Sequence, residues 1–459
     1  THSFSDRVIK YSTDALLHVV DEQGYYEAFR STDEVRYYGD NSRDRRLDKL
    51  SNGNYRLRDP GGESRVFDAS GRLVSIRDPA DPTSSVDLFY DGEGRLQTLR
   101  DVRGREVWFD HDSGTGLLTE IFLPDDNVIG YDYDADRNLT AVDYGGGQIK
   151  QYLYHEAGLA LPRQKNHLTG IVSETGIRYA SFSYDSKDRV LSSTVHGTPA
   201  DTTTLNYDGP NHVTVTTAHE GTREYTFQPG IYRRPLSTID SAGNSRKSYD
   251  LQGRLETETD KRNHVTRYAY DASGYVSAVT QAEDTPEQRR IEMDRAAATH
   301  LLTEHRIRDA AGVLKAKTAW TYNARNQVAS VTVTDPADNA TRSIATTYCE
   351  APDVSAANGA CPILGLVKTI DGPRPGTLDV TTYQYRPADE AGCAASPETC
   401  AYRKGDLWKV VNASDHVTEI LAYDGAGRLK SAKDVNGVIT DFEYSPRGWL
   451  TARKVRGTN

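Results

Sequence analysis

A seven-residue pattern returns through the sequence at a short, nearly constant interval. It reads aromatic-Asp-x-x-Gly-Arg-Leu, and its complete copies begin at Phe67, Tyr90, Tyr249 and Tyr423. Looser copies, which keep only part of the pattern, begin at Tyr133, Tyr184, Tyr270, Tyr322 and Tyr444. The steps from Phe67 to Tyr90 and from Tyr423 to Tyr444 are 23 and 21 residues. A period this short indicates one supersecondary unit that repeats and covers its apolar face with its neighbours.

Each residue type in the pattern has a role in local structure. The aspartate can accept hydrogen bonds from the backbone N–H groups that follow it, which starts a turn. Three residues later a glycine, for example Gly427, can adopt the positive φ that closes a hairpin, after which Arg-Leu begins a strand. A second turn follows at Asp434–Gly437, and in Asp260–Asn263 asparagine takes the place of this glycine. We therefore predict two hairpin turns and two strands in each unit.

The strand that enters each tyrosine indicates which face is buried. Two residues before the tyrosine lies another large apolar side chain, such as Leu88 before Tyr90 and Phe442 before Tyr444. Residues at this spacing share one face of a sheet. A tyrosine suits a wall that is dry at the ring and wet at the hydroxyl, and arginine stems can cover apolar surface. We expect a continuous antiparallel sheet with one packed and one solvated face.

Composition also favours an all-β fold. The chain has 28 tyrosines but only 9 phenylalanines, and 37 glycines interrupt it. Aromatic residues between glycine and aspartate are typical of strands and tight turns. The best helical candidate, Pro286–Asp309, also fits a period of two, so we predict strand and turn there.

Charge and hydropathy exclude two classes of partner. The net charge of −11 argues against a nucleic acid held by its phosphates. No apolar run approaches the roughly 20 residues that a membrane-spanning helix needs. The sequence therefore predicts neither a nucleic-acid partner nor a membrane span.

The repeat resembles the Rhs/YD-repeat family, from about Arg56 to Trp449, with degenerate copies between Tyr144 and Leu236. The resemblance implies a long β-sheet that spirals into a hollow shell. Such shells belong to bacterial polymorphic toxins and Tc toxin complexes, and to the related teneurin ectodomains. In the bacterial proteins they enclose a C-terminal toxic polypeptide. The resemblance therefore implies a secreted or cell-surface scaffold whose partners are a polypeptide cargo or adjoining shell segments.

One family feature is missing from this sequence. Family members carry a plug that ends in a self-cleavage motif of the type Asp-Pro-x-Gly-Leu. No Asp-Pro pair here precedes Gly-Leu; the pairs are Asp59-Pro60, Asp78-Pro79, Asp81-Pro82 and Asp335-Pro336. We expect a segment of a larger shell, or a naturally separated piece, that neither cleaves itself nor is toxic.

Two regions depart from the repeat. Residues 1–50 lack it and contain a charged run, which we interpret as a cap or edge region before a shell at 51–459. A stretch at about 348–403 interrupts the shell and holds all four cysteines: Cys349, Cys361, Cys393 and Cys400. Their spacing does not resemble a zinc site. In an exported protein we expect Cys349–Cys361 and Cys393–Cys400 disulfides, with free thiols as the alternative.

Two groups of residues are candidates for chemistry. Asp132, Asp134, Asp136 and Asn138 alternate as calcium ligands do, but Arg137 and Asp143 replace the glycine and glutamate of a calcium loop. We therefore predict a repeat turn there and no metal. His264 and Tyr268 share a strand face and suit an acid/base pair, yet they align with Val438 and Phe442 as ordinary wall positions.

Two classes of function remain open. The first is a non-catalytic shell without a cofactor, which the repeat phase of the tyrosines favours. The second is a secreted β-protein that binds or cleaves carbohydrate, as a polysaccharide lyase does, with cell-surface carbohydrate as its partner. Its stacking platforms would be Trp108, Trp320, Trp408 and Trp449.

Overall fold

The described part of the chain forms one antiparallel sheet of 38 strands. The computed structural model describes residues 6–10, 15–21, 26–39, 45–59, 62–78, 80–81, 84–197, 201–230, 233–356 and 359–457. Each strand pairs with the strand that follows it, from β1 with β2 to β37 with β38. The prediction of a continuous all-β sheet is confirmed.

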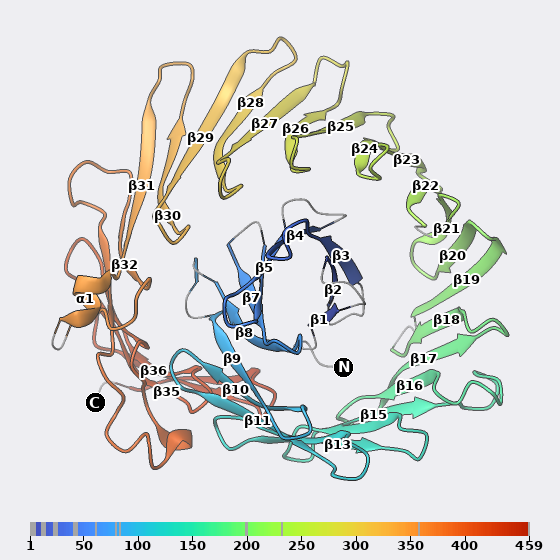
Figure 1. The fold of residues 1–459 in the computed structure, drawn as a ribbon, viewed down its shortest axis with the longest axis horizontal. Helices are drawn as coiled ribbons and strands as arrows, with labels where there is room; N and C mark the ends of the chain where they lie inside the picture. Colours follow the sequence, from blue (N-terminus) through green and yellow to red (C-terminus); the bar gives the residue numbers. More distant parts are fainter. Residues whose placement is uncertain are drawn as a thin grey trace.

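The first ten strands form an inner coil. Strands β1–β8 wind around the centre of Figure 1, and β9 and β10 lead outward from them. The backbone N–H of Val8 in β1 donates a hydrogen bond to the carbonyl of Gly71, 2.8 Å away, so that the coil meets its own start. The strands are β1 (Arg7–Lys10), β2 (Leu16–Val20), β3 (Tyr26–Arg30), β4 (Arg36–Gly39), β5 (Arg46–Lys49), β6 (Tyr55–Arg58), β7 (Ser64–Phe67), β8 (Leu73–Arg77), β9 (Val86–Tyr90) and β10 (Leu96–Asp101).

The inner coil has a packed apolar core. Thirteen buried side chains from β1 to β10 form a single cluster: Val8, Leu17, Val19, Phe29, Tyr37, Leu47, Tyr55, Leu57, Phe67, Leu73, Leu88, Leu96 and Leu99. Alternate residues supply them, as in β2, where Leu17 and Val19 are buried and their neighbours are not. Residues 1–50, which we expected to form a cap or edge region, contain five strands, β1–β5, of this coil.

The remaining strands form an outer coil that runs around the inner one (Figure 1). They are β11 (Glu106–His111), β12 (Leu118–Phe122), β13 (Val128–Tyr133), β14 (Leu139–Asp143), β15 (Ile149–Tyr154), β16 (Leu168–Val172), β17 (Arg178–Tyr184), β18 (Val190–Val195), β19 (Asp201–Gly209), β20 (His212–Thr217), β21 (Gly221–Phe227), β22 (Pro235–Asp240), β23 (Gly243–Tyr249), β24 (Leu255–Thr259), β25 (Val265–Tyr270), β26 (Val276–Gln281), β27 (Arg289–Arg295), β28 (Leu302–Arg308), β29 (Leu314–Tyr322), β30 (Val328–Thr334), β31 (Thr341–Tyr348), β32 (Val367–Asp371), β33 (Thr381–Tyr385), β34 (Leu407–Val411), β35 (Val417–Tyr423), β36 (Leu429–Lys433), β37 (Ile439–Tyr444) and β38 (Leu450–Val455). Pro286–Asp309 contains β27 and β28, so the prediction of strand and turn there is confirmed.

The outer coil is a single layer with little apolar burial. Its buried hydrophobic residues in the described part are Val142, Ala180, Ala278, Leu366, Tyr385 and the four cysteines. The expected packed face is therefore found in the inner coil, whereas most outer side chains are half-buried. Because the outer coil is wide, side chains on its opposite sides are too far apart to touch. Its apolar side chains therefore contact mainly those of neighbouring strands.

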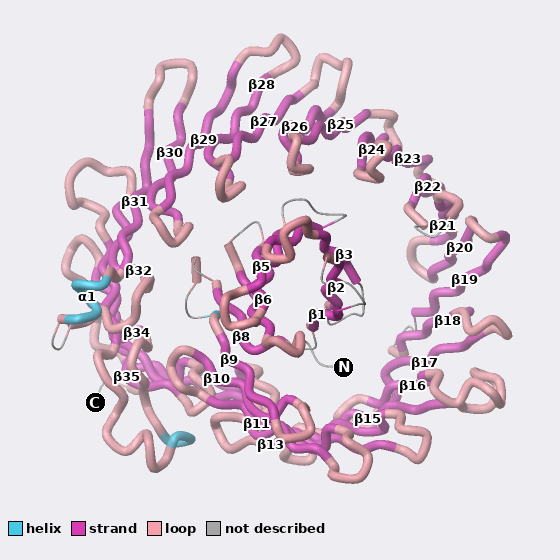
Figure 2. Tube along the Cα trace, viewed as in Figure 1, coloured by secondary structure: helices cyan, strands magenta, loops and turns pink. Residues whose placement is uncertain are grey.

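The hairpin turns of the outer coil fall on two edges (Figure 2). In a sheet whose strands pair in chain order, alternate turns lie at the same edge. The turns that follow the repeat tyrosines form one edge, which we call the YD edge, and the intervening turns form the opposite edge. Two loops at the YD edge are longer, and they hold helix α1 (Ala351–Ser355) and the 3-10 turn η2 (Pro397–Thr399). In the sequence, strands β32 and β33 lie between these two loops, and they pair with β31 and β34, so that the sheet is continuous there.

Candidate functional site: the repeat turn and the seam between coils

The repeat turn has one recurring geometry, illustrated by the turn after Tyr423. The N–H of Asp424 donates to the carbonyl of Arg428, and the N–H of Gly427 donates to the carbonyl of Asp424, both at 2.9 Å. Gly427 has a φ of 83°. Pairing then skips one residue, because Tyr423 faces Leu429 and Ala422 faces Ser431. These features define a hairpin that ends in a bulge with glycine at the left-handed position, as the sequence predicts.

The motif arginine joins two consecutive units. Arg428 donates from Nε to Oδ2 of Asp424 in its own turn at 2.6 Å. Its guanidinium also lies 4.9 Å from the ring centre of Tyr444, the tyrosine of the next unit. The same cation–π contact occurs for the pairs Arg72 with Tyr90, Arg189 with Tyr207, and Arg254 with Tyr270. The surface that the arginine stem covers is thus the ring of the following tyrosine.

The repeat tyrosines also carry a hydrogen bond that sequence reasoning missed. At ten repeat positions the tyrosine hydroxyl donates to the carbonyl of the first residue of the preceding strand, whereas we had expected it to face water. Ten such ties occur: Tyr90 to Leu73, Tyr184 to Leu168, Tyr207 to Val190, Tyr249 to Pro235, Tyr270 to Leu255, Tyr322 to Leu302, Tyr348 to Val328, Tyr385 to Val367, Tyr423 to Leu407 and Tyr444 to Leu429. Burial raises the pKa of both Tyr90 and Tyr385 to about 12.

The end of the outer coil lies against its beginning, along a line that we call the seam. In Figure 1 the red strands β35 and β36 lie beside the cyan strands β10 and β11. The strongest contact is a buried ion pair: Nη2 of Arg105 lies 2.9 and 2.7 Å from the two carboxylate oxygens of Asp406. The side chains of Arg105 and Asp406 are only 9% and 4% exposed. Arg103 approaches the same carboxylate to 3.1 Å, and the N–H of Arg403 donates to it at 2.8 Å.

Two further contacts extend the seam. Arg428 Nη2 lies 2.6 Å from Oδ2 of Asp125, in the turn between β12 and β13. Arg447 pairs with Glu174, in the turn between β16 and β17, and stacks on Tyr144 at 4.3 Å. Each contact joins the YD edge of the last strands to the opposite edge of earlier strands. These partners lie about 300 residues apart in the sequence, and no local signal marks them.

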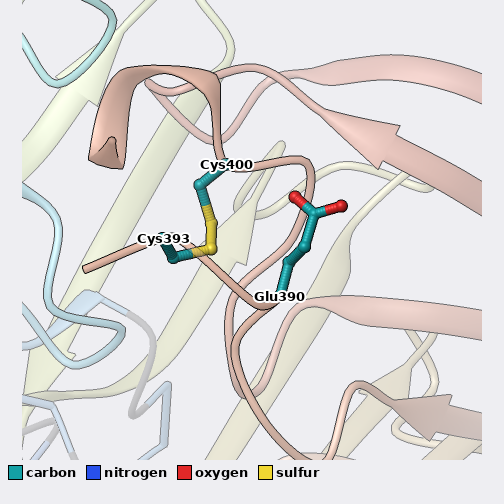
Figure 3. Close-up of side chains that lie close together, drawn as sticks. All are labelled: Glu390, Cys393 and Cys400. Carbon is teal, nitrogen blue, oxygen red and sulfur yellow. A yellow bond between two sulfur atoms is a disulfide. The ribbon is translucent and has the colours of Figure 1, made fainter. Parts of the chain in front are cut away.

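The four cysteines lie in the two long loops at the YD edge. The structure joins Cys349 to Cys361 and Cys393 to Cys400. A ligand oxygen of Glu390 lies within 4.8 Å of the sulfurs of Cys393 and Cys400 (Figure 3). Because thiolates, not disulfide sulfurs, bind metal ions, the intact disulfide leaves this group without its sulfur ligands.

The other residues singled out in the sequence occupy repeat positions. Asp134 Oδ1 accepts the N–H of Asn138 at 2.8 Å, as in a repeat turn, and Arg137 adopts a φ of 64°. His264 precedes β25, is exposed, and places Nδ1 3.2 Å from Oδ2 of Asp260. The backbone N–H of His264 holds the pKa of Asp260 below its usual value. Tyr268 lies in β25 and pairs with Val279.

The four tryptophans come from separate parts of the outer coil. Trp108 in β11 and Trp449 before β38 are 47% and 62% exposed, and Trp320 in β29 is half-buried. The indole N–H of Trp408 in β34 donates to Glu419 at 2.9 Å. A separate pocket of about 450 Å³, between His155 and Pro162 and against Tyr184, has no acidic side chain, lysine or arginine in its lining.

We compared the chain with known protein families, curated proteins and solved structures. Residues 56–106, 112–149, 249–286 and 423–458 match the RHS repeat family. A search of curated proteins finds no match. Among solved structures, a Tc holotoxin pore of Photorhabdus luminescens is similar with 12% identity and a TM-score of 0.43, over 96% of this chain and 30% of that chain. The TcdB2–TccC3 crystal structure is similar with 12% identity and a TM-score of 0.43, over 97% of this chain and 31% of that chain. This chain therefore spans about 30% of the length of these structures.

Proposed function

We propose that this chain, which carries RHS repeats, forms part of the wall of a toxin-associated shell that encloses a polypeptide. The observation that carries the proposal is the seam. A single-layered sheet winds around the inner coil and is fastened to its own beginning by the buried pair of Arg105 and Asp406. A wall fastened in this way separates an interior from the solvent without a second layer of structure.

The recurring polar side chains of the repeat bind one another and the backbone, which supports a non-catalytic role. In a complete unit the aspartate accepts backbone N–H groups and its own arginine, as Asp424 does from Arg428. The arginine also stacks on the next tyrosine, and that tyrosine binds a backbone carbonyl. The polar groups of the motif are thus paired with one another.

Export of the chain is a further part of the proposal. Disulfides persist in oxidising compartments, and two are present here. We infer that the chain acts outside the cytosol or at a cell surface, with a toxin or an adjoining shell segment as its polypeptide partner. Among the described residues, none of the helices is both long and apolar enough to cross a membrane.

Protease protection of a passenger tests enclosure. An unstructured polypeptide is joined after Asn459, and its digestion is compared between the native wall and a variant with Arg105→Ala and Arg428→Ala. We expect slow digestion within the intact wall and fast digestion once the seam is weakened. Equal digestion rates in the two proteins would contradict enclosure.

Expression inside bacteria tests the non-catalytic role. We expect normal growth and an intact mass for the purified chain. Growth arrest would contradict this role, and so would a defined fragment that disappears in Asp335→Ala. We choose Asp335 because both residues of its Asp-Pro pair are described by the structure. In the other three pairs the proline lies outside the described residues.

Carbohydrate binding is the second candidate, favoured by the exposure of Trp108 and Trp449. Calorimetry with acidic polysaccharides tests it. Binding that is lost in Trp449→Ala but kept in Trp320→Ala would support this candidate. Depolymerisation that is lost in Tyr268→Phe would indicate a lyase instead of a wall.

A further inference from the structure

The loop between β33 and β34, residues 386–406, holds the carboxylate of the seam. Its base is closed by two hydrogen bonds, from the N–H of Arg386 to the carbonyl of Asp406 at 2.8 Å and from the N–H of Gly405 to the carbonyl of Arg386 at 2.9 Å. Asp406 is the last residue of the loop and binds Arg105 across the seam. The position of this carboxylate therefore depends on the order of the loop.

The same loop takes part in the second seam contact. A Cβ atom built on Gly425 would lie 2.7 Å from the carbonyl oxygen of Glu398 and 2.5 Å from that of Pro124. Three backbones thus meet at Gly425: the loop, the turn between β12 and β13, and the YD turn that follows Tyr423. Glu398 lies between Cys393 and Cys400, so the disulfide-closed segment itself forms part of the seam.

Hydrogen bonds beside the Cys393–Cys400 disulfide hold the path from this segment to Asp406. Directly after Cys400, the N–H of Ala401 donates to Oε2 of Glu390 at 2.7 Å, and the carbonyl of Ala401 accepts the N–H of Tyr423 at 2.7 Å. The N–H of Glu390 donates to the carbonyl of Tyr402 at 3.1 Å. These bonds join the two sides of the loop next to the disulfide and attach the loop to β35.

We propose that the Cys393–Cys400 disulfide is a redox-sensitive lock on the seam. A dithiol reductant attacks one sulfur as a thiolate, which breaks the S–S bond and forms a mixed disulfide. The second thiol of the reductant then releases the protein, so that two cysteine thiols form and the dithiol becomes a cyclic disulfide. The released loop no longer holds Asp406 against Arg105, and the outer coil opens in a reducing compartment.

The other disulfide provides a matched control. Cys349 and Cys361 lie in an apolar cluster with Leu366 and Tyr385, and all four cysteines are buried. The carbonyl of Gly365 in that loop accepts Nε2 of Gln327, which also donates to the carbonyl of Ala80 at 3.4 Å, outside residues 101–106 and 123–127. A disulfide constrains the unfolded chain less when it closes a shorter loop, and the separations are 12 residues here and 7 in the lock. Loss of the lock should therefore act on local order more than on overall stability.

Hydrogen exchange of the full chain, followed by mass spectrometry, tests the lock. The peptides of interest span residues 101–106 and 123–127, which form the opposite side of the seam and contain no cysteine. We expect exchange on the order of tenfold faster there in Cys393→Ser/Cys400→Ser, and also in the wild type with dithiothreitol. The Cys349→Ser/Cys361→Ser variant should match the oxidised wild type. Chelator is present throughout, so that no metal on Glu390 and the freed thiols replaces the disulfide.

Two results would overturn the proposal. One is unchanged exchange at residues 101–106 in Cys393→Ser/Cys400→Ser. The other is a dithiothreitol effect that persists in that variant but is lost in Cys349→Ser/Cys361→Ser. Small-angle scattering adds an independent measure, since an opened coil has a larger radius of gyration. These measurements need no passenger, so they are independent of whether the wall encloses a polypeptide.

Discussion

Leu73 and Leu429 occupy the same place in the repeat, one in the inner coil and one in the outer coil. Both follow a Gly-Arg pair, begin a strand and accept the hydroxyl of a repeat tyrosine at their carbonyl. Leu73 is 1% exposed within the core of the inner coil, whereas Leu429 is only half-buried. The same local structure therefore serves two modes of stabilisation.

The difference follows from the width of each coil. In the inner coil, residues from β1 to β10 meet in one apolar cluster, so the hydrophobic effect acts across the coil. In the outer coil the side chains find partners mainly along the sheet: hydroxyl ties, stacked arginines and ion pairs. Pairing of each strand with the next one along the chain gives only short-range contacts, and the seam adds the long-range ones.

The largest effect should come from the seam. Arg105→Ala leaves the carboxylate of Asp406, 4% exposed, with Arg103 as its remaining charged partner. We expect a loss of about 3 kcal/mol in the free energy of unfolding. All four tryptophans lie in the outer coil, so their fluorescence during urea denaturation reports on it. Arg95→Ala removes partly exposed pairs with Asp91 and Glu93 and should cost much less. Equal losses in the two variants would mean that the seam pair stabilises the chain no more than surface ion pairs do.

The two leucines allow a direct test of the comparison. We expect Leu73→Ala to cost about 3 kcal/mol and Leu429→Ala about 1 kcal/mol, because only the first leaves a cavity in a packed core. Hydrogen exchange of the inner strands measures the first, and tryptophan fluorescence measures the second. Losses of similar size would mean that the outer coil has an apolar core as effective as the inner one.

Two glycines at the same position of the repeat turn separate the seam from the turn itself. Gly92 and Gly425 each follow the motif aspartate, and a Cβ on Gly92 meets nothing within 4 Å. On Gly425 it would collide with the backbone of Pro124 and Glu398. We expect Gly425→Ala to cost about 2 kcal/mol and Gly92→Ala almost nothing, measured by thermal unfolding. A neutral Gly425→Ala would show that the seam is loosely packed.

The smallest effect concerns the hydroxyl ties at high pH. The pKa of Tyr385 is about 12 in the folded chain because its ring is buried, whereas an unfolded tyrosine ionises near 10. Its contribution to stability is complete below pH 10 and is lost as the pH rises through about 12. Tyr385→Phe should cost about 1 kcal/mol at pH 8 and should reduce the loss of stability above pH 10. Urea denaturation at the two pH values measures both, and an unchanged pH dependence would contradict the assignment.

The turns were predictable because their chemistry is local. Asp424, Gly427 and Arg428 act on one another within five residues, so the sequence alone indicates the turn, its positive φ and the strand that follows. The pattern also predicts a single continuous sheet. By contrast, the destination of each tyrosine hydroxyl depends on the register between strands, which the motif does not specify.

The seam and the inner core could not be predicted in the same way. Arg105 and Asp406 lie 301 residues apart, and their meeting depends on how many strands complete one coil. Curvature accumulates over many strand pairs, and no residue of the motif records it. Residues 1–50 lack the motif, yet the alternation of buried Leu17 and Val19 was a readable strand signal that the absence of the repeat obscured.

Pairing in chain order gives the molecule a mechanical polarity. A force applied at the C-terminal end loads the hydrogen bonds of one strand pair at a time, as in a zipper, instead of shearing many pairs together. The first strands to leave, β38 to β34, must also break the seam contacts of Arg447, Arg428 and Asp406. The middle strands then peel singly, and the inner coil, with its shared core, unravels last. A motor that threads the chain from this end therefore meets two points of high resistance, separated by a long stretch of low resistance.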